Sequence, residues 1–174
     1  MYSAPLYFIA FLPAVMILYQ LCPQKFRKYV LLLANYVFFY TWSKFFLVYQ
    51  VINMVITYIS AKVIDHTTNK KIKKISLIIA ILINLGVLVV LKYTNFFGEN
   101  IFAIFHQPFT PVRLIAPIGI SYYTLQMISY LMDINGGKIH TDHSIVDFAV
   151  YASFFPTLIQ GPITRFNEIK DSIH

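Results

Sequence analysis

The chain has 174 residues, of which 58% are hydrophobic, 17% aromatic and only 12% charged, and its mean hydropathy is +0.65. Soluble domains carry about 25% charged residues, so this composition excludes an ordinary soluble domain. It also excludes intrinsic disorder, because so apolar a chain must bury its side chains. The single cysteine, Cys22, excludes an internal disulfide framework and a cysteine-based zinc cluster.

Six charge-free runs are candidates for membrane crossing, since an ionised side chain at mid-bilayer costs about 2.5–3.5 kcal/mol. They cover residues 2–24, 29–43, 45–61, 75–91, 114–132 and 148–164. The pattern predicts an all-α, polytopic integral membrane bundle with about five or six membrane segments. Residues 1–91 are expected to form four transmembrane helices in a lipid bilayer. Residues 92–174 are expected to hold an interfacial segment, a polar-striped helix and an irregular Gly-Pro segment.

The first run also fits a secretory signal peptide. No Lys or Arg precedes it, however, and residues 19–22 lack the small side chains that a cleavage or lipoprotein site needs. We therefore favour a retained first membrane helix. The Cys22 thiol is expected to be interfacial or buried, with acylation as the alternative.

Basic residues orient the four helices. The first and third connections of a helical zigzag lie on the same side, and they hold most of the cations: Lys25, Arg27 and Lys28, then Lys62, Lys70, Lys71, Lys73 and Lys74. The second connection holds only Lys44. The positive-inside rule places the first and third connections in the cytoplasm and the N-terminus outside. The net charge of +7 is thus explained by topology, and no nucleic-acid partner is expected.

The chain changes character after Leu91. Polar groups lie beside aromatic residues over 92–100, and residues 101–106 are apolar again, which is typical of an interfacial amphipathic stretch. Pro108, Pro111 and Pro117 then predict a loop, with a helix restarting near Pro117.

Four polar residues of the next helix share one face. Tyr122, Gln126, Ser129 and Asp133 follow one another at spacings of four, three and four. Such a face cannot point into lipid. It either forms interhelical hydrogen bonds, which spacing alone favours, or lines a polar cavity or substrate path.

The polar-striped helix is expected to end at residues 136–137, where two glycines permit a left-handed cap. A polar surface turn follows, and Ser144 with Asp147 resembles a capping box for a helix that stops at Pro156. Gly161 and Pro162 then make a continuous helix improbable. Irregular backbone at membrane depth needs cover from protein or a wet cavity, so this segment points to a functional cavity. A loop at the membrane surface is the alternative.

A catalytic histidine was sought among the five in the chain: His66, His106, His140, His143 and His174. None lies in a recognisable nucleophile, zinc or triad arrangement. His140 and His143 have a spacing compatible with metal binding, but the polar turn predicts that both lie on the surface. We expect no metal site, and spacing alone names no enzyme.

Four ordered segments nevertheless resemble a known family. They cover residues 37–42 (VFFYTW), 91–97 (LKYTNFF), 116–126 (APIGISYYTLQ) and 154–166 (FFPTLIQGPITRF). Together they resemble the N-terminal half of the membrane-bound O-acyltransferases, in the bacterial branch that O-acetylates alginate. The last segment is also similar to the more distant proteins that transfer D-alanine to lipoteichoic acid.

The resemblance implies a multi-pass enzyme of the bacterial inner membrane that passes an acyl group, commonly acetyl, to hydroxyls of an exported or cell-wall polysaccharide. It implies acetyl-CoA or an acyl carrier as the donor, no bound cofactor, and the polysaccharide or an extracytoplasmic transfer protein as partner. The family's histidine lies in a Trp-His motif of the second half. Here Trp42, the one tryptophan, precedes Ser43, so we expect no catalytic residue in this chain. Alone, without the remaining half of the enzyme, it is expected to be inactive.

In that setting the resemblance gives the polar residues roles. Tyr122, Gln126, Ser129 and Asp133 would form one wall of the cavity, with Gly161 and Pro162 shaping the approach to it. Arg165 would pair with Asp133 or bind an anionic part of the donor, and an interfacial anchor is the equal alternative. The competing hypothesis for the whole chain is a non-catalytic membrane scaffold or transporter-like subunit.

Overall fold

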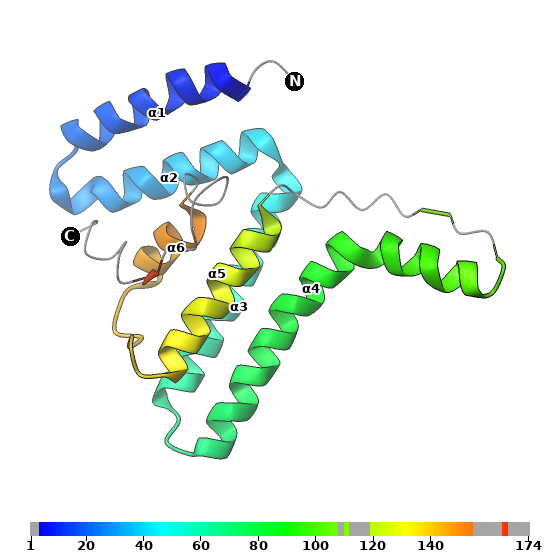
Figure 1. The fold of residues 1–174 in the computed structure, drawn as a ribbon. Coiled ribbons are helices and arrows are strands. Elements are labelled where there is room, and N and C mark those ends of the chain that lie inside the picture. Colours follow the sequence, from blue (N-terminus) through cyan, green and yellow to red (C-terminus); the bar gives the residue numbers. More distant parts are fainter. Residues whose placement is uncertain (1–3, 108–109, 112–118, 155–164, 167–174) are drawn as a thin grey trace. The chain divides into compact units, whose positions relative to one another are not determined.

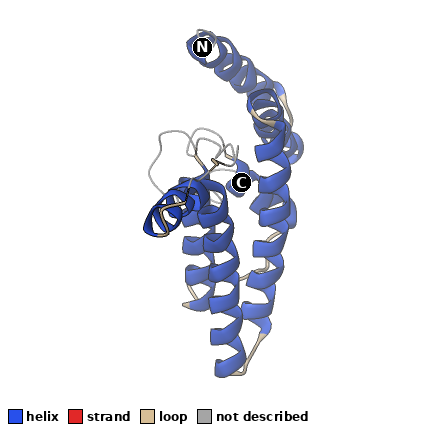
Figure 2. Cartoon of the chain, turned by 90° about the vertical axis from the view of Figure 1, so that its right-hand side faces the viewer, coloured by secondary structure: helices blue, strands red, loops and turns tan. Residues whose placement is uncertain are grey.

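The computed structural model describes residues 4–107, 110–111, 119–154 and 165–166. Its regular elements are α-helices joined by loops (Figures 1 and 2). They are α1 (Ala4–Leu21), α2 (Gln24–Trp42), α3 (Lys44–His66), α4 (Lys70–Ile104), α5 (Ile120–Asn135) and α6 (Ile145–Ser153). The predicted all-α class is confirmed.

Two of the described helices have the length and composition of a membrane span. They are α3, with 23 residues, and α4, with 35. At 1.5 Å per residue they are about 35 and about 52 Å long, against a hydrocarbon core of about 30 Å. In contrast, α2 begins with three basic residues within its first five positions. The long apolar helices support a membrane location.

The chain divides inside α3 into two compact units. Unit 1 comprises residues 1–54 and 142–174, and unit 2 comprises residues 55–141. In unit 1, both α1 and α6 pack on α2; in unit 2, α4 packs on α5.

The core of unit 1 is aromatic where α2 ends and α3 begins. Phe38, Phe39 and Phe46 are buried, and the ring of Phe39 meets the other two edge to face at centroid distances of 5.4 and 5.3 Å. Edge-to-face pairs of this kind add about 0.5–1.5 kcal/mol to the burial itself. The short helix α6 is buried along most of its length, from Asp147 to Ser153.

Helix α4 continues past Leu91, where the sequence predicts a separate interfacial stretch. Figure 1 shows that α4 bends before its C-terminal part. Two polar side chains in that part bond within the helix: Thr94 donates to the carbonyl of Val90, and Asn100 to that of Phe96. Such bonds satisfy polar groups locally and favour bending. The interfacial position of residues 92–104 stays a prediction.

The predicted ends of α5 and α6 are confirmed. Helix α5 stops at two glycines, where Gly137 has a φ of 70° and Lys138 N–H donates to the Asp133 carbonyl at 2.9 Å. Helix α6 starts at a complete Ser144–Asp147 capping box and ends at Ser153, before Pro156. The start of α5 follows Gly119, whose φ is 91°. Pro108 and Pro117 lie outside the described residues.

Candidate functional site

The polar stripe of α5 lies at the boundary between the buried and exposed sides of the helix. Gln126 and Asp133 are 4% and 7% exposed, Ser129 is half-buried, and Tyr122 is 50% exposed. The wholly buried side of α5 is mostly apolar and aromatic and includes Tyr123, whereas the opposite side carries exposed Leu125 and Met132. The spacing that predicts one face is therefore correct, but only two of its four members are buried.

Asp133 is held by the cap that ends its own helix. Because Gly137 turns the chain back, Lys138 places its Nζ 3.5 Å from a carboxylate oxygen of Asp133. The Lys138 side chain is 61% exposed, so this ion pair contributes little to stability. Arg165 is exposed and belongs to the other compact unit, so its pairing with Asp133 stays a prediction. Gly161 and Pro162 lie outside the described residues.

A second polar contact joins α3 to α4 inside unit 2. Both Asn84 and Thr57 have no exposed surface, and Asn84 Nδ2 lies 3.4 Å from Thr57 Oγ1 and 2.9 Å from the Ala80 carbonyl. An amide in a membrane helix must find partners within the protein. Asn84 therefore fixes the face that α4 presents to α3.

The end of α3 is tied to the turn that follows α5. The Asp65 carboxylate accepts hydrogen bonds from the Thr141 N–H at 2.7 Å and from the Thr141 hydroxyl at 2.8 Å. His140 Nδ1 lies 3.1 Å from the other carboxylate oxygen. One acidic side chain thus ties Thr141 and His140 of the turn to the end of α3.

In unit 1, Asp147 links the start of α6 to α2. Its carboxylate lies 3.1 Å from Lys28 Nζ and accepts the Ser144 hydroxyl at 2.6 Å. Burial by itself would raise the pKa of Asp147, but the bond from Ser144 and the bond and charge of Lys28 hold that pKa below its usual value. Asp147 is therefore ionised at neutral pH.

Two buried side chains attach the other end of α6. Asn35 Nδ2 of α2 donates to Ser153 Oγ at 3.2 Å, and Gln50 Nε2 of α3 donates to the Ala152 carbonyl at 2.9 Å. The second bond satisfies a carbonyl in the last turn of α6, where intrahelical donors end. Helix α6 is thus anchored at both ends by polar side chains.

The expectation that His143 lies on the surface is wrong. Its side chain is 1% exposed, and its ring centroid lies 4.2 Å from that of Phe166 and 6.3 Å from that of Phe148. The polar residues around His143 in the sequence predict a solvated turn, but the aromatic ring of Phe166 covers the imidazole. His140, with a side chain 71% exposed, lies on the surface as predicted.

The buried amides Asn35, Gln50 and Asn84 are among the polar residues that sequence reasoning missed. Each lies in a run that was chosen because it lacks charged residues. That criterion does not distinguish a neutral amide from an apolar residue. The usable signal is an Asn or Gln in the middle of an apolar helix, because such a residue must face protein. Among the described residues, no group of three His, Cys, Asp or Glu side chains is arranged to hold a metal ion.

The helices and their apolar composition define an α-helical membrane-type protein. Its sequence is related to polymer-modifying acyltransferases along nearly the whole chain. It is 32% identical to the probable alginate O-acetylase AlgI of Pseudomonas aeruginosa over 99% of this chain and 34% of that protein. It is 31% identical to the peptidoglycan O-acetyltransferase of Helicobacter pylori over 97% of this chain and 38% of that protein.

A third relative is more distant. The teichoic acid D-alanyltransferase of Lacticaseibacillus rhamnosus is 27% identical over 74% of this chain and 29% of its own length. These matches confirm the resemblance to the membrane-bound O-acyltransferases that the four motifs predict. The chain spans about a third of the length of these relatives. No family model and no solved structure matches it.

Proposed function

We propose that this chain forms part of a membrane-bound O-acyltransferase that esterifies hydroxyl groups of an exported or cell-wall polysaccharide. The observation that carries the proposal is the similarity to two O-acetylating proteins over at least 97% of the chain. Their named polymers differ, but both present sugar hydroxyls. The proposed transferred group is acetyl, with acetyl-CoA or an acyl carrier as the donor and no bound cofactor.

The proposed topology is multi-pass in the bacterial inner membrane, with five or six membrane segments and an extracytoplasmic N-terminus. The length and composition of α3 and α4 support two of these crossings. Four basic residues at the start of α4, Lys70, Lys71, Lys73 and Lys74, favour a cytoplasmic position for that end. A cytoplasmic donor and an extracytoplasmic acceptor then require a path across the bilayer.

The polar edge of α5 is the proposed part of that path in this chain. An acyl donor or sugar needs hydrogen-bonding groups that water and lipid do not occupy. Gln126 and Asp133 are buried, and Ser129 and Tyr122 lie next to them on the more accessible side. The catalytic histidine is proposed to come from the part of the relatives that this chain does not match.

The experiment is deletion of the gene that contains this sequence, followed by complementation. Ester-linked acetate and D-alanine are released by mild alkali from the exopolysaccharide, peptidoglycan and teichoic acid fractions and measured. We expect acetate to fall in one fraction and to return with the wild-type gene. Sequencing beyond codon 174 adds a direct check, because the proposal expects a frame that encodes a Trp-His motif.

Variants separate the site from the scaffold. Gln126→Leu and Asp133→Asn should lower ester content several-fold at unchanged protein level. The matched control is Asp142→Asn, which changes a carboxylate that is 72% exposed, and it should have no effect. Unchanged esters in every fraction after deletion would contradict the proposal and favour the non-catalytic scaffold or transporter-like subunit.

A further inference from the structure

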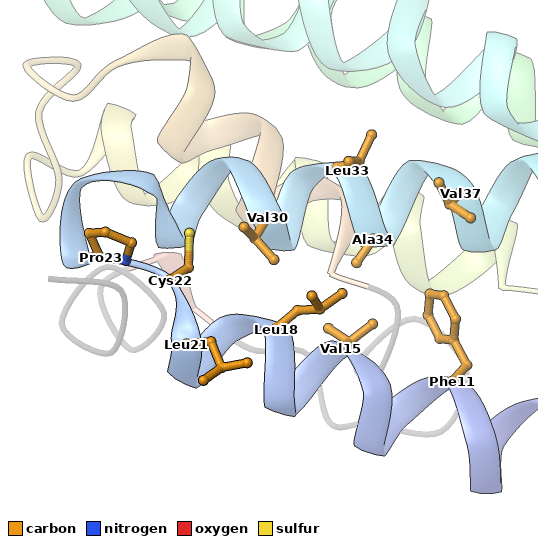
Figure 3. A pocket seen from close by; sticks show the side chains of 10 residues that line it. All are labelled: Phe11, Val15, Leu18, Leu21, Cys22, Pro23, Val30, Leu33, Ala34 and Val37. Atoms are coloured by element: carbon orange, nitrogen blue, oxygen red, sulfur yellow. The ribbon is translucent and has the colours of Figure 1, made fainter.

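Helices α1 and α2 enclose an apolar groove of about 570 Å³ in unit 1. Figure 3 shows Val30 and Ala34 of α2 and Val15 and Leu18 of α1 between the two helices. The lining extends from Cys22 and Pro23 at one end to Phe11 and Val37 at the other. Its walls remain open, because Leu21 and Leu33 are 78% and 66% exposed. The residues that line it offer almost only carbon, so an occupant must be apolar along most of its length.

The Cys22–Pro23 end of the groove is positively charged. Arg27 Nε donates to the Cys22 carbonyl at 3.2 Å, which holds the guanidinium beside the lining, and Lys25 lies in the same first turn of α2. Neither cation forms an ion pair with an acidic side chain of the described residues. Their neighbour Lys28 differs, since Asp147 neutralises it.

The start of α2 strengthens this positive field. Its cap residue, Pro23, makes no side-chain hydrogen bond to the helix, and the first turn contains no acidic residue. The first N–H groups of a helix carry partial positive charge and favour an anion. The groove therefore joins an apolar wall to an unneutralised cationic end.

The length of the groove and its cationic end fit an anionic lipid. Along α2 the lining from Pro23 to Val37 extends about 21 Å. One leaflet of hydrocarbon is about 15 Å deep, so an acyl chain that starts at the membrane surface reaches along most of the groove.

We propose that the α1–α2 groove binds one acyl chain of an anionic glycerophospholipid whose phosphate lies at Lys25 and Arg27. This lipid is distinct from the substrates of the proposed acyl transfer. It fills the apolar space between two helices and neutralises the two cations.

The test uses the full-length protein purified in mild detergent. Native mass spectrometry measures the retention of phosphatidylglycerol and of phosphatidylcholine with identical chains. The wild-type protein should retain phosphatidylglycerol preferentially. Replacing Lys25 and Arg27 by Gln should weaken that binding about fivefold for each charge removed. The matched control Lys44→Gln removes an exposed cation that lies over Tyr40 and should leave binding unchanged.

The acyl part is tested by filling the groove. Ala34→Phe adds bulk at the lining and should lower retention of both lipids. Its control Ile17→Phe, at a 57% exposed position of α1 outside the lining, should not. The labelling rate of Cys22 with a thiol reagent, measured on the peptide that contains Cys22, reports occupancy, and phosphatidylglycerol should slow it. Circular dichroism verifies that each variant keeps its helix content.

Four results would overturn the inference. Equal retention of the two lipids would show that the protein does not select an anionic headgroup. Wild-type retention by Ala34→Phe would show that the acyl chain does not bind in the groove. Soluble glycerol 3-phosphate that competes as well as phosphatidylglycerol would assign the cations to free phosphate. If Cys22 is already protected from the thiol reagent without lipid, and added lipid does not change its labelling rate, another part of the protein covers the groove.

Discussion

Asp147→Asn should destabilise the protein more than any other single change at the start of α6. The substitution keeps the size of the side chain but leaves Lys28, whose side chain is only 24% exposed, without its counter-charge. Stranding one member of a fully buried pair costs roughly 3–5 kcal/mol, and the partial exposure here lowers the expectation to about 2 kcal/mol. Lys28→Met should cost less, about 1 kcal/mol, because Asp147 keeps its bonds to Ser144 and a favourable place at a helix N-terminus.

The pH dependence of this effect has a definite sign. The folded-state pKa of Asp147 lies below the usual carboxyl value of about 3.9, so folding favours the ionised form. Its contribution is complete above that value and disappears as the pH falls through the lower folded-state pKa. The wild type should therefore lose stability below about pH 4, and Asp147→Asn should lose less over the same range.

Unfolding of the full-length protein in mild detergent, driven by SDS at pH 7 and again at pH 3.5, measures these differences. The double variant Lys28→Met with Asp147→Asn removes both charges and should be more stable than Asp147→Asn alone. Asp142→Asn, at an exposed carboxylate of the same turn, serves as the control. If the two single effects simply add in the double variant, the ion pair contributes nothing and the reasoning fails.

Three further substitutions test other contacts, two of them in the same unfolding assay and the third by proteolysis. Asn35→Leu removes the buried bond to Ser153 and should cost about 1 kcal/mol; an unchanged value would mean that α6 is not held there. Gly137→Ala should cost about 1 kcal/mol because a side chain is strained at a φ of 70°, whereas Gly86→Ala, whose added Cβ meets open space, should cost nothing. Asp65→Asn should expose the 138–144 turn to proteolysis, and an unchanged cleavage rate would contradict its role in ordering that turn.

Local signals in the sequence predict the ends of the helices well. The Ser144–Asp147 box and the glycines at 136–137 act within a few residues, so no distant contact is needed for them to form. The extension of α4 to Ile104 is not predicted, because its polar residues look interfacial until Thr94 and Asn100 are seen to bond inside the helix. Burial of His143 depends on Phe166, a contact between distant segments that spacing cannot reveal.

The buried amides also bear on the two interpretations of the α5 stripe. Buried neutral amides make several of the contacts between helices inside each unit: Asn35 and Gln50 in unit 1, and Asn84 in unit 2. A stripe that served only such packing would be buried throughout, as these amides are. Instead its members range from the buried Gln126 to the half-exposed Tyr122. That gradient is the one expected at the rim of a cavity that another part of the protein completes. The cavity interpretation stays a proposal, and Gln126→Leu tests it most directly, because this change removes hydrogen-bonding capacity and leaves the charge of the helix unaltered.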